Sequence, residues 1–394
     1  MTGETSGARD MTQAGTRKEV GTAPDGRSVA ILLGGPSAEH DVSVVSGWAI
    51  ADALAEAGVS VERIFIDLAG GWWSVPASAS AGRPRPGSFD DPRSVGALGP
   101  RSAAQVLEDL AARAPLPVVF PALHGPFGED GTVQALLEAY GLPYAGAGVA
   151  ASAVGMDKAL YKRLVRGLGM PVVDWIEVTA ADWAADRDAV LGDLAAFAQR
   201  IGRPGLIVKP ARMGSSVGIT VAHTPAERAA ALDEAFRFDT LAVVERYLDH
   251  PRELEVAVIG NDARSVRAFG PGEVFPGREF YDYVAKYSDG VSETATRAGI
   301  DEALAARVRE TAIAAYCAVG CEGFARVDLL LDGTDLYVSE INTLPGFTPS
   351  SLFPQLAATS LGGFEAVCRE IVDLAVQRHK GRVRRRLTPA DLPR

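Results

Sequence analysis

Residues 28–58 read SVAILLGGPSAEHDVSVVSGWAIADALAEAG, and this stretch decides the class of fold. The apolar run Val29–Leu33 has the length and aliphatic composition of a buried strand, and Gly34 and Gly35 follow it as a turn. The next apolar residues recur at helical spacing, and Gly58 is the kind of residue that ends a helix. A strand, a glycine turn and a helix in this order predict that the folded part opens with an α/β unit.

The rest of the chain divides into three folded units between two tails. Strand and helix patterns alternate as far as Gly146, with a Gly/Pro/Ser-rich insert at 77–100. A smaller α+β unit follows and begins with one helix expected over 152–169, and a third unit combines a long helix with a hairpin. The predicted segments are a disordered tail over 1–26, an N-terminal α/β domain over 27–146, a central domain over 147–245, a C-terminal domain over 246–380 and a basic tail over 381–394.

The composition of the 394 residues disfavours several classes of protein. Hydrophobic residues at 47% and charged residues at 23% are ordinary for a soluble globular protein, and a net charge of -11 disfavours general nucleic-acid binding. The first residues lack a signal-peptide pattern and no apolar run reaches the roughly 18 residues of a membrane span, so we expect a cytoplasmic protein with no membrane partner. The basic run 382–386 leaves a nucleic-acid or membrane patch as an alternative, although short basic tails are usually only solvated.

The segment 324–346, FARVDLLLDGTDLYVSEINTLPG, carries the strongest chemical signal. Its Asp-Gly pair predicts a turn between two strands, and a three-residue loop Gly-Thr-Asp would place Asp328 opposite Glu340 and Arg326 opposite Asn342. Opposed residues share one face of a sheet, so two carboxylates and an amide would meet beside an arginine. Because facing carboxylates repel each other, this oxygen-rich set predicts a hard divalent cation such as Mg²⁺.

Two other interpretations of this hairpin stay open. Charges on an antiparallel strand most often form a solvated salt-bridge face, which needs no metal. A turn with an even number of residues would place the two pairs on opposite faces and so remove the cluster.

A glycine-containing loop at 209–218, KPARMGSSVG, lies between two apolar β segments. Such a loop can turn backbone N–H groups and hydroxyls toward phosphate oxygens, and Lys209 at the strand end would add a point charge. A flexible surface hairpin is the alternative interpretation of this loop taken by itself. The lysines deserve a separate look because only six of the 39 basic residues are lysines, at 18, 158, 162, 209, 286 and 380.

Three shorter features point to ligand binding. Glu39 follows the first glycine turn at a helix start and could meet a substrate amine, and His124 ends a strand where open α/β sheets bind ligands. The aromatic and charged stretch 277–287 is expected to be a mobile lid that closes over phosphates. The alternatives are a simple tight turn, a structural histidine and a loop whose aromatic residues pack on the body. A Gly-x-Gly-x-x-Ala match at 146–151 is interpreted as a loop before a helix, because only a short strand precedes it.

Eight sequence blocks occur in one order between Ser28 and about His379. They are LLGGPSAEHDVSVVSG, ALHGPFGEDG, MDK, VKPARMGSSVGI, VVERYL, EFYDYVAKYSDG, ARVDLLL and SEINTLPGFTPSSL. In these blocks the chain closely resembles the D-alanyl-D-alanine ligases of the ATP-grasp superfamily. The resemblance implies α/β and α+β domains in a three-domain ATP-grasp architecture, with a Rossmann-like N-terminal domain before the ATP-grasp domains and ATP between the central and C-terminal domains.

The resemblance also implies roles for individual residues. The residues expected at ATP are Lys158, Lys209, Ser216, Glu245, Arg246, Tyr247, Leu248, Glu253 and Lys286. The expected ligands of two Mg²⁺ ions, for which Mn²⁺ can substitute, are Asp328, Glu340 and Asn342. The residues expected at the two D-alanines are Glu39, His124 and Ser351. The expected catalytic residues are Glu39, Ser215 and Tyr287, which tie the lid down, and Arg326 and Gly346, which stabilise the oxyanion.

The activity implied by the resemblance is ATP-dependent ligation of two D-alanines through a D-alanyl phosphate, for peptidoglycan precursor synthesis, by a homodimer. Relatives that make D-alanyl-D-lactate usually carry a histidine where Lys286-Tyr287 stands, so Tyr287 favours an amine as the second substrate. A D-alanyl-D-lactate or D-alanyl-D-serine ligase is the alternative. A nucleotide-binding protein without turnover is disfavoured, because such a protein has no chemical reason to keep the metal, arginine and lysine residues together.

Overall fold

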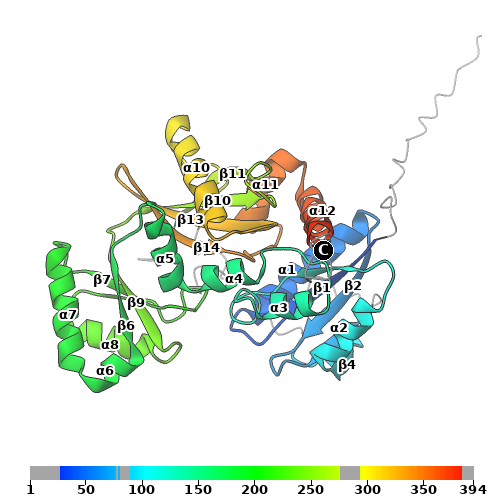
Figure 1. Cartoon of the computed structure of the whole chain (residues 1–394), viewed down its shortest axis with the longest axis horizontal. Helices are drawn as coiled ribbons and strands as arrows, with labels where there is room; N and C mark the ends of the chain where they lie inside the picture. Colours follow the sequence, from blue (N-terminus) through cyan, green and yellow to red (C-terminus); the bar gives the residue numbers. More distant parts are fainter. Residues whose placement is uncertain (1–26, 77–78, 80–88, 276–292, 384–394) are drawn as a thin grey trace, which may run out of the picture.

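The structure, a computed structural model, describes residues 27–76, 79, 89–275 and 293–383 (Figure 1). The expected tail over 1–26, residues 77–78 and 80–88 of the insert, and the expected lid with Lys286 and Tyr287 lie outside the described residues. Figure 1 shows an N-terminal unit in blue and cyan, a central unit in green at the opposite end, and a C-terminal sheet between them. No helix in the described ranges is long and apolar enough to cross a membrane.

The N-terminal unit is built on a five-stranded sheet in the order β4-β3-β2-β1-β5, in which β1 is parallel to both β2 and β5. Its strands are β1 (Ser28–Gly34), β2 (Ser60–Ile66), β3 (Trp72–Val75), β4 (Leu98–Arg101) and β5 (Val118–Pro121). Its helices are α1 (His40–Glu56), α2 (Ala103–Ala111) and α3 (Thr132–Ala139), with a short 3₁₀ turn η1 (Pro92–Val95). The predicted α/β opening is therefore confirmed, and Gly34 is required there because its φ is +89° and a Cβ would lie 2.3 Å from the Ile66 carbonyl oxygen.

The region predicted as one helix over 152–169 is two helices, so that prediction is wrong. The helices are α4 (Val149–Met156) and α5 (Lys158–Gly167), with Asp157 between them in an extended conformation. The Asp157 carboxylate accepts a hydrogen bond of 2.9 Å from the Leu160 amide and so caps α5. Because an aspartate that caps a new helix ends the previous one, Lys158 lies in the first turn of α5.

The central unit is an antiparallel sheet in the order β6-β9-β7-β8. Its strands are β6 (Trp175–Thr179), β7 (Leu206–Pro210), β8 (Thr220–Ala222) and β9 (Leu241–Arg246). Its helices are α6 (Ala180–Ala185), α7 (Arg187–Arg200) and α8 (Pro225–Ala235), which bury their apolar residues against the sheet. A second small cluster joins Ala159 of α5 to Ala211 and Val243, so α5 leads directly to the strands that carry Lys209 and Glu245.

The C-terminal unit is an antiparallel sheet in the order β12-β11-β10-β13-β14. Its strands are β10 (Arg252–Ile259), β11 (Arg267–Phe275), β12 (Glu293–Ala295), β13 (Phe324–Asp332) and β14 (Asp335–Asn342). Its helices are α10 (Glu302–Ala318), α11 (Leu352–Leu361) and α12 (Phe364–Val383). One core joins α10, α4 and α5 to this sheet, and another joins α11 and α12 to α1, so the N-terminal and C-terminal units share buried side chains.

The predicted strand pairing in the β13–β14 hairpin is confirmed, although the predicted loop is not. Asp332 pairs with Asp335, which leaves a two-residue turn, and an irregularity at Ser339 then adds one residue to β14. The extra residue shifts the register back, so Asp328 does lie opposite Glu340. The turn has the even length that threatened the cluster, and the bulge restores the shared face.

Candidate active site

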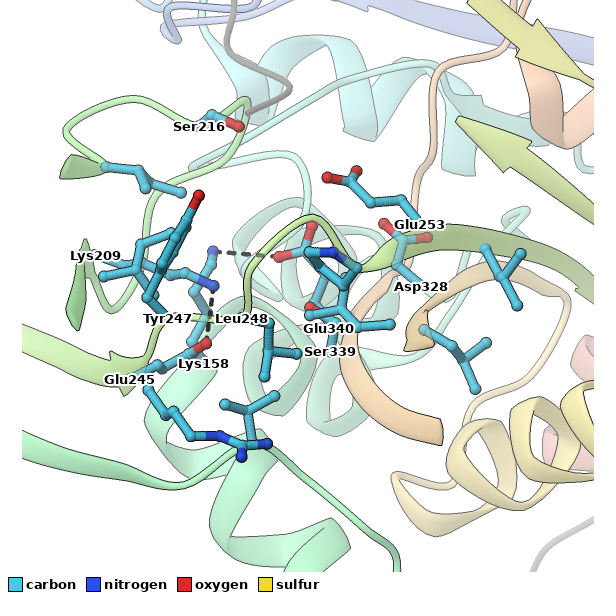
Figure 2. Close-up of a pocket in the computed structure, with 18 of the residues that line it drawn as sticks. Lys158, Lys209, Ser216, Glu245, Tyr247, Leu248, Glu253, Asp328, Ser339 and Glu340 are labelled. Atoms are coloured by element: carbon cyan, nitrogen blue, oxygen red, sulfur yellow. Dashed lines mark hydrogen bonds and ion pairs between the residues drawn. The ribbon is translucent and has the colours of Figure 1, made fainter. Parts of the chain in front are cut away.

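An open pocket lies between the central and C-terminal sheets (Figure 2). It is lined by residues of β7, β9, β10, β13 and β14, together with Lys158 of α5 and the segment that joins β9 to β10. Figure 2 shows Lys158 and Lys209 on one side of the pocket and Glu253, Asp328 and Glu340 on the other. Two cations therefore face three carboxylates across a space between two sheets, an arrangement suited to a polyanion and its counter-ions.

Glu245 at the end of β9 lies between two lysines. Its Oε2 is 3.0 Å from Lys209 Nζ and its Oε1 is 3.2 Å from Lys162 Nζ. Burial alone would raise the pKa of Glu245, but the two ammonium groups outweigh burial and hold that pKa below its ordinary value. Burial would likewise lower the pKa of Lys209, but Glu245 outweighs it and the pKa is raised. Glu245 and Lys209 are therefore both charged at neutral pH.

Lys158 links the pocket to the loop between β7 and β8. Its backbone amide donates to the Ala211 carbonyl at 2.9 Å, and its Nζ donates to the Met213 carbonyl at 2.6 Å. The same Nζ is 3.5 Å from Glu340 Oε2, an ion pair drawn as a dashed line in Figure 2. These two contacts hold the Lys158 ammonium between the β7–β8 loop and Glu340.

Arg326 and Asp328 form a bidentate ion pair on β13. Arg326 Nε donates to Asp328 Oδ1 at 2.7 Å and Nη2 donates to Oδ2 at 2.6 Å. Asn342 Nδ2 donates to the same Oδ2 at 2.9 Å, and Glu255 Oε2 lies 3.3 Å from Arg326 Nε. Burial would lower the pKa of Arg326, but Asp328 and then Glu255 outweigh it and raise that pKa well above its ordinary value.

The β7–β8 loop reaches the N-terminal unit at Glu39. Ser215 has a φ of +51°, and its hydroxyl donates to Glu39 Oε1. Glu39 is the N-cap residue of α1, but its side chain makes no capping hydrogen bond and instead accepts one from the loop. A Cβ on Gly214 would lie 2.8 Å from Glu39 Oε2, so the loop backbone approaches this carboxylate closely.

His124 and Glu129 are buried next to Glu39. His124 Nδ1 lies 2.9 Å from the Leu344 carbonyl oxygen and Nε2 lies 3.3 Å from Ser46 Oγ. Burial lowers the pKa of His124, so the ring is neutral at neutral pH. Burial, followed by the charge of Glu39, raises the pKa of Glu129 well above its ordinary value, while the Gly125 amide donates to it at 3.2 Å.

Gly346 and Ser351 lie close together between β14 and α11. A Cβ on Gly346 would be 3.3 Å from Ser351 Oγ, and that hydroxyl accepts a hydrogen bond of 3.0 Å from the Thr348 amide. The neighbouring Phe347 amide donates to Ser46 Oγ at 3.4 Å. Ser46 therefore joins this loop to the His124 side of the N-terminal unit.

Comparison with known proteins gives the family. A family model described as the N-terminus of D-Ala-D-Ala ligase matches residues 28–147, and one described as the C-terminus matches 164–373. The chain belongs to the D-alanine–D-alanine ligase family. A ligase of this name from Heliobacterium modesticaldum is 41% identical over 91% of this chain and 97% of its own, and one from Chloroherpeton thalassium is 37% identical over 92% and 99%.

Solved structures of the ligase family share the fold. The D-alanine–D-alanine ligase of Coxiella burnetii has a TM-score of 0.72 and 32% identity, and covers 91% of this chain and 96% of its own. The VanG D-Ala:D-Ser ligase of Enterococcus faecalis has a TM-score of 0.74 and 29% identity, and covers 89% and 99%. The expected ATP-grasp architecture is thus confirmed.

The structure brings together most of the residues that sequence analysis expected at the ligase site. The pocket is lined by Lys158, Lys209, Ser216, Glu245, Arg246, Tyr247, Leu248, Glu253, Arg326, Asp328 and Glu340. Asn342 contacts Asp328, Glu39 contacts Ser215, and Gly346 adjoins Ser351. The Arg246 guanidinium donates to the Tyr337 hydroxyl at 3.0 Å. Lys286 and Tyr287 lie outside the described residues.

Three buried ionisable residues at the site were not predicted from the sequence. Lys162 follows Lys158 by one helical turn, Glu255 follows Glu253 on the same face of β10, and Glu129 follows His124 in the same loop. Counting one helical turn onward from Lys158, and two strand residues onward from Glu253, would have identified the first two. Glu129 had no such signal, because its burial depends on packing between units.

The oxygen donors at the hairpin fit a hard divalent cation. Among the described residues no three His, Cys, Asp or Glu side chains gather as a metal site, and the third oxygen here is the amide of Asn342. Two carboxylates and one amide oxygen are ligands typical of Mg²⁺, which takes its remaining ligands from water and phosphates. Asp328 is at present paired with Arg326 and Asn342, so these cationic and amide groups offset its charge.

Proposed function

We propose that the chain joins two D-alanine molecules to D-alanyl-D-alanine in the cytoplasm, converting ATP to ADP and phosphate, as a step in making peptidoglycan precursors. Family membership over most of the chain supports this reaction. The observation that carries it is the pocket in which Lys158 and Lys209 face Asp328 and Glu340, next to a buried Glu39. The first set suits ATP with a divalent cation, and the second suits the ammonium group of an amino acid.

The proposed division of labour follows the three predicted domains. Residues 27–146 bind the first D-alanine through Glu39 and His124, and 147–245 with 246–380 hold ATP between their sheets. Lys158, Lys209 and Ser216 bind phosphates, and the adenosine lies along the end of β9, the segment after it and the start of β10. These adenosine-binding residues are Glu245, Arg246, Tyr247, Leu248 and Glu253, all of which line the pocket.

In the first step the carboxylate of the first D-alanine attacks the γ-phosphate of ATP and ADP leaves. Glu39 holds the ammonium group, which orients the carboxylate toward the pocket. Lys158 and Lys209 offset the negative charge that develops on the phosphoryl oxygens. Asp328, Glu340 and Asn342 would hold Mg²⁺, which supplies Lewis-acid stabilisation of the phosphate charge when bound.

In the second step the neutral amine of the second D-alanine attacks the acyl carbon and phosphate leaves. Ser351 binds the carboxylate of this second substrate at the start of α11. Arg326 and the Gly346 amide stabilise the oxyanion of the tetrahedral intermediate, because N–H donors offset the negative charge that develops there. Tyr287 and Lys286 belong to the proposed lid, which excludes water from the acyl phosphate.

A D-alanyl-D-serine or D-alanyl-D-lactate ligase is the second candidate. The Enterococcus D-Ala:D-Ser ligase matches the fold as well as the D-alanine–D-alanine ligase of Coxiella does, so overall shape does not separate these substrates. Competition between D-alanine, D-serine and D-lactate as second substrate, measured at several pH values, separates them. We expect D-alanine to dominate.

The reaction is tested by phosphate release from ATP and Mg²⁺ with D-alanine, L-alanine or no amino acid, with the product identified by mass spectrometry. The proposal predicts release that depends on D-alanine and yields the dipeptide. Release without D-alanine, or with no dipeptide, would contradict it. We also propose a homodimer, which light scattering would detect as a mass near twice that of one chain.

A further inference from the structure

Lys162 is the most deeply buried lysine described, and the reaction outlined above gives it no task. Its side chain is 2% exposed and lies on α5, one turn after Lys158. It does not line the pocket, whereas Lys209 and Glu245 do. Burial of an ammonium group is costly unless a counter-ion holds it, so its position requires a reason.

The counter-ion of Lys162 is Glu245, which is also the counter-ion of Lys209. The Glu245 side chain is 3% exposed, with one oxygen 3.2 Å from Lys162 and the other 3.0 Å from Lys209. Figure 2 shows Glu245 below Lys209, with the ion pair between them dashed. One buried carboxylate thus serves two ammonium groups, of which only Lys209 reaches the pocket.

This sharing affects what Lys209 can do when a nucleotide arrives. If Lys209 were the only partner of Glu245, turning it toward phosphates would leave a buried carboxylate unpaired, which is strongly unfavourable. With Lys162 in place the carboxylate keeps a partner while Lys209 moves. The Lys162 ammonium, which does not line the pocket, therefore lowers the free-energy cost of turning Lys209 from Glu245 to the phosphates.

We propose that Lys162 is a positioning residue for ATP binding, which stays paired with Glu245 and so makes the Lys209 ammonium available to the nucleotide phosphates. The inference rests on the proposed function only in that ATP occupies this pocket. It concerns phosphate affinity and gives Lys162 no contact with the ligand.

The electrostatics of the trio agree with this division. Burial lowers the pKa of Lys162 despite the opposing effect of Glu245, and Lys209 and Arg166 lower it further, whereas the pKa of Lys209 is raised. The Lys162 ammonium also lies 5.7 Å from the centre of the Trp175 ring, and the Arg166 guanidinium lies 3.9 Å from it. The surroundings of Lys162 thus disfavour its charged form overall, and Glu245 is the group that opposes this effect.

The test compares binding of a non-hydrolysable ATP analogue with binding of adenosine, by calorimetry or competition, in Lys162→Met, Lys162→Arg and the unchanged chain. Lys162→Met should weaken the analogue about tenfold, equivalent to about 1.4 kcal/mol, and leave adenosine affinity unchanged. Lys162→Arg keeps the charge and should bind both ligands normally. Equal weakening of both ligands, or no change in either, would overturn the proposal.

Two further variants separate this role from a purely structural one. Arg378→Met removes another buried cation, 6% exposed and outside the pocket lining, and should reduce stability without changing the ratio of the two affinities. In a Glu245→Gln background there is no carboxylate to leave unpaired, so Lys162→Met should change analogue binding less than it does alone. An undiminished loss there would contradict the proposal, and this double variant serves also if Lys162→Met does not fold.

Binding measurements keep this inference separate from the proposed reaction. A chain that binds the analogue but makes no dipeptide would refute the reaction and still allow the role of Lys162 to be measured. A chain that makes the dipeptide, and in which Lys162→Met leaves analogue binding unchanged, would refute the inference alone.

Discussion

The nucleotide pocket and the surroundings of Glu39 both bury ionisable side chains, but they differ in how charge is balanced. In the pocket each buried carboxylate has a cation beside it, and the pKa of Glu245 is lowered and that of Lys209 raised. Beside Glu39, burial dominates, and the pKa of His124 is lowered and that of Glu129 raised. The first region favours charged forms and the second favours neutral forms.

The difference follows from what each region is proposed to bind. ATP brings several negative charges, so its pocket needs cations that are already charged and already oriented. An amino acid brings one ammonium group, which a buried carboxylate such as Glu39 can bind. Mutations should therefore affect activity most in the nucleotide pocket, and stability should respond to pH most clearly around Glu129 and His124.

Asp328→Asn is expected to have the largest effect. It removes one of the two carboxylates proposed for Mg²⁺ and should lower kcat/KM by at least about 10²-fold, the scale seen when one group that stabilises developing charge is lost. Steady-state kinetics at several Mg²⁺ concentrations measures this change. Asp335→Asn, at the exposed turn of the same hairpin, is the control and should be unaffected. Unchanged Mg²⁺-dependent turnover in Asp328→Asn would refute the metal assignment.

Glu39→Gln should affect only the amino-acid side of the comparison. Loss of a charged hydrogen bond to the ammonium group, about 2 kcal/mol, should raise the KM for D-alanine roughly thirtyfold. Binding of an ATP analogue should remain normal, as should both constants in Glu56→Gln at the far end of α1. A parallel loss of nucleotide affinity would show that the two regions are not independent.

Glu129→Gln should be more stable than the parent protein, and the difference in unfolding free energy should grow as pH rises. Because the pKa of Glu129 in the folded protein is raised, its contribution to stability is lost as pH increases from about 4.5 through the folded value. The amide cannot ionise, so the variant should be more stable than the parent at pH 8 and match it more closely at pH 4.5. Urea denaturation at both pH values tests this. A variant less stable at pH 8 would reverse the assigned sign.

His124→Asn is expected to have the smallest effect, a change in stability below neutral pH. The folded pKa of His124 is lowered, so the unfolded chain takes up a proton first and stability falls as pH drops below about 6.5. Asparagine can still donate to the Leu344 carbonyl but does not titrate. The slope of unfolding free energy between pH 7.5 and 5.5 should be shallower in the variant, and an equal slope would contradict the prediction.

Local pattern could predict the elements that carry the site better than their boundaries. Asp328 lies opposite Glu340 as expected, but a two-residue turn and a bulge at Ser339 produce that pairing. The short turn and the extra residue of the bulge cancel each other in the register of the hairpin. The sequence shows only the total number of residues between the paired positions. Asp157 likewise divides a continuous helical pattern, because a side-chain cap competes with helix continuation and leaves the hydrophobic period intact.

Contacts between units were the least accessible from sequence. Ser215 and Glu39 are 176 positions apart, and only the family resemblance suggested that they meet. Glu255 could be assigned to the site from the register between β10 and β13, which places it opposite Asp328. The shared role of Glu245 depends on α5 packing against the central sheet, which periodicity along one segment cannot show.

The central claim is that the carboxylate of the first D-alanine is phosphorylated where the two regions meet. The most direct measurement uses D-alanine labelled with ¹⁸O at both carboxylate oxygens and analyses the phosphate released from unlabelled ATP by mass spectrometry. Attack by the carboxylate on the γ-phosphate, followed by displacement of phosphate from the acyl carbon, predicts one ¹⁸O atom in each phosphate. Unlabelled phosphate formed together with the dipeptide would contradict the account.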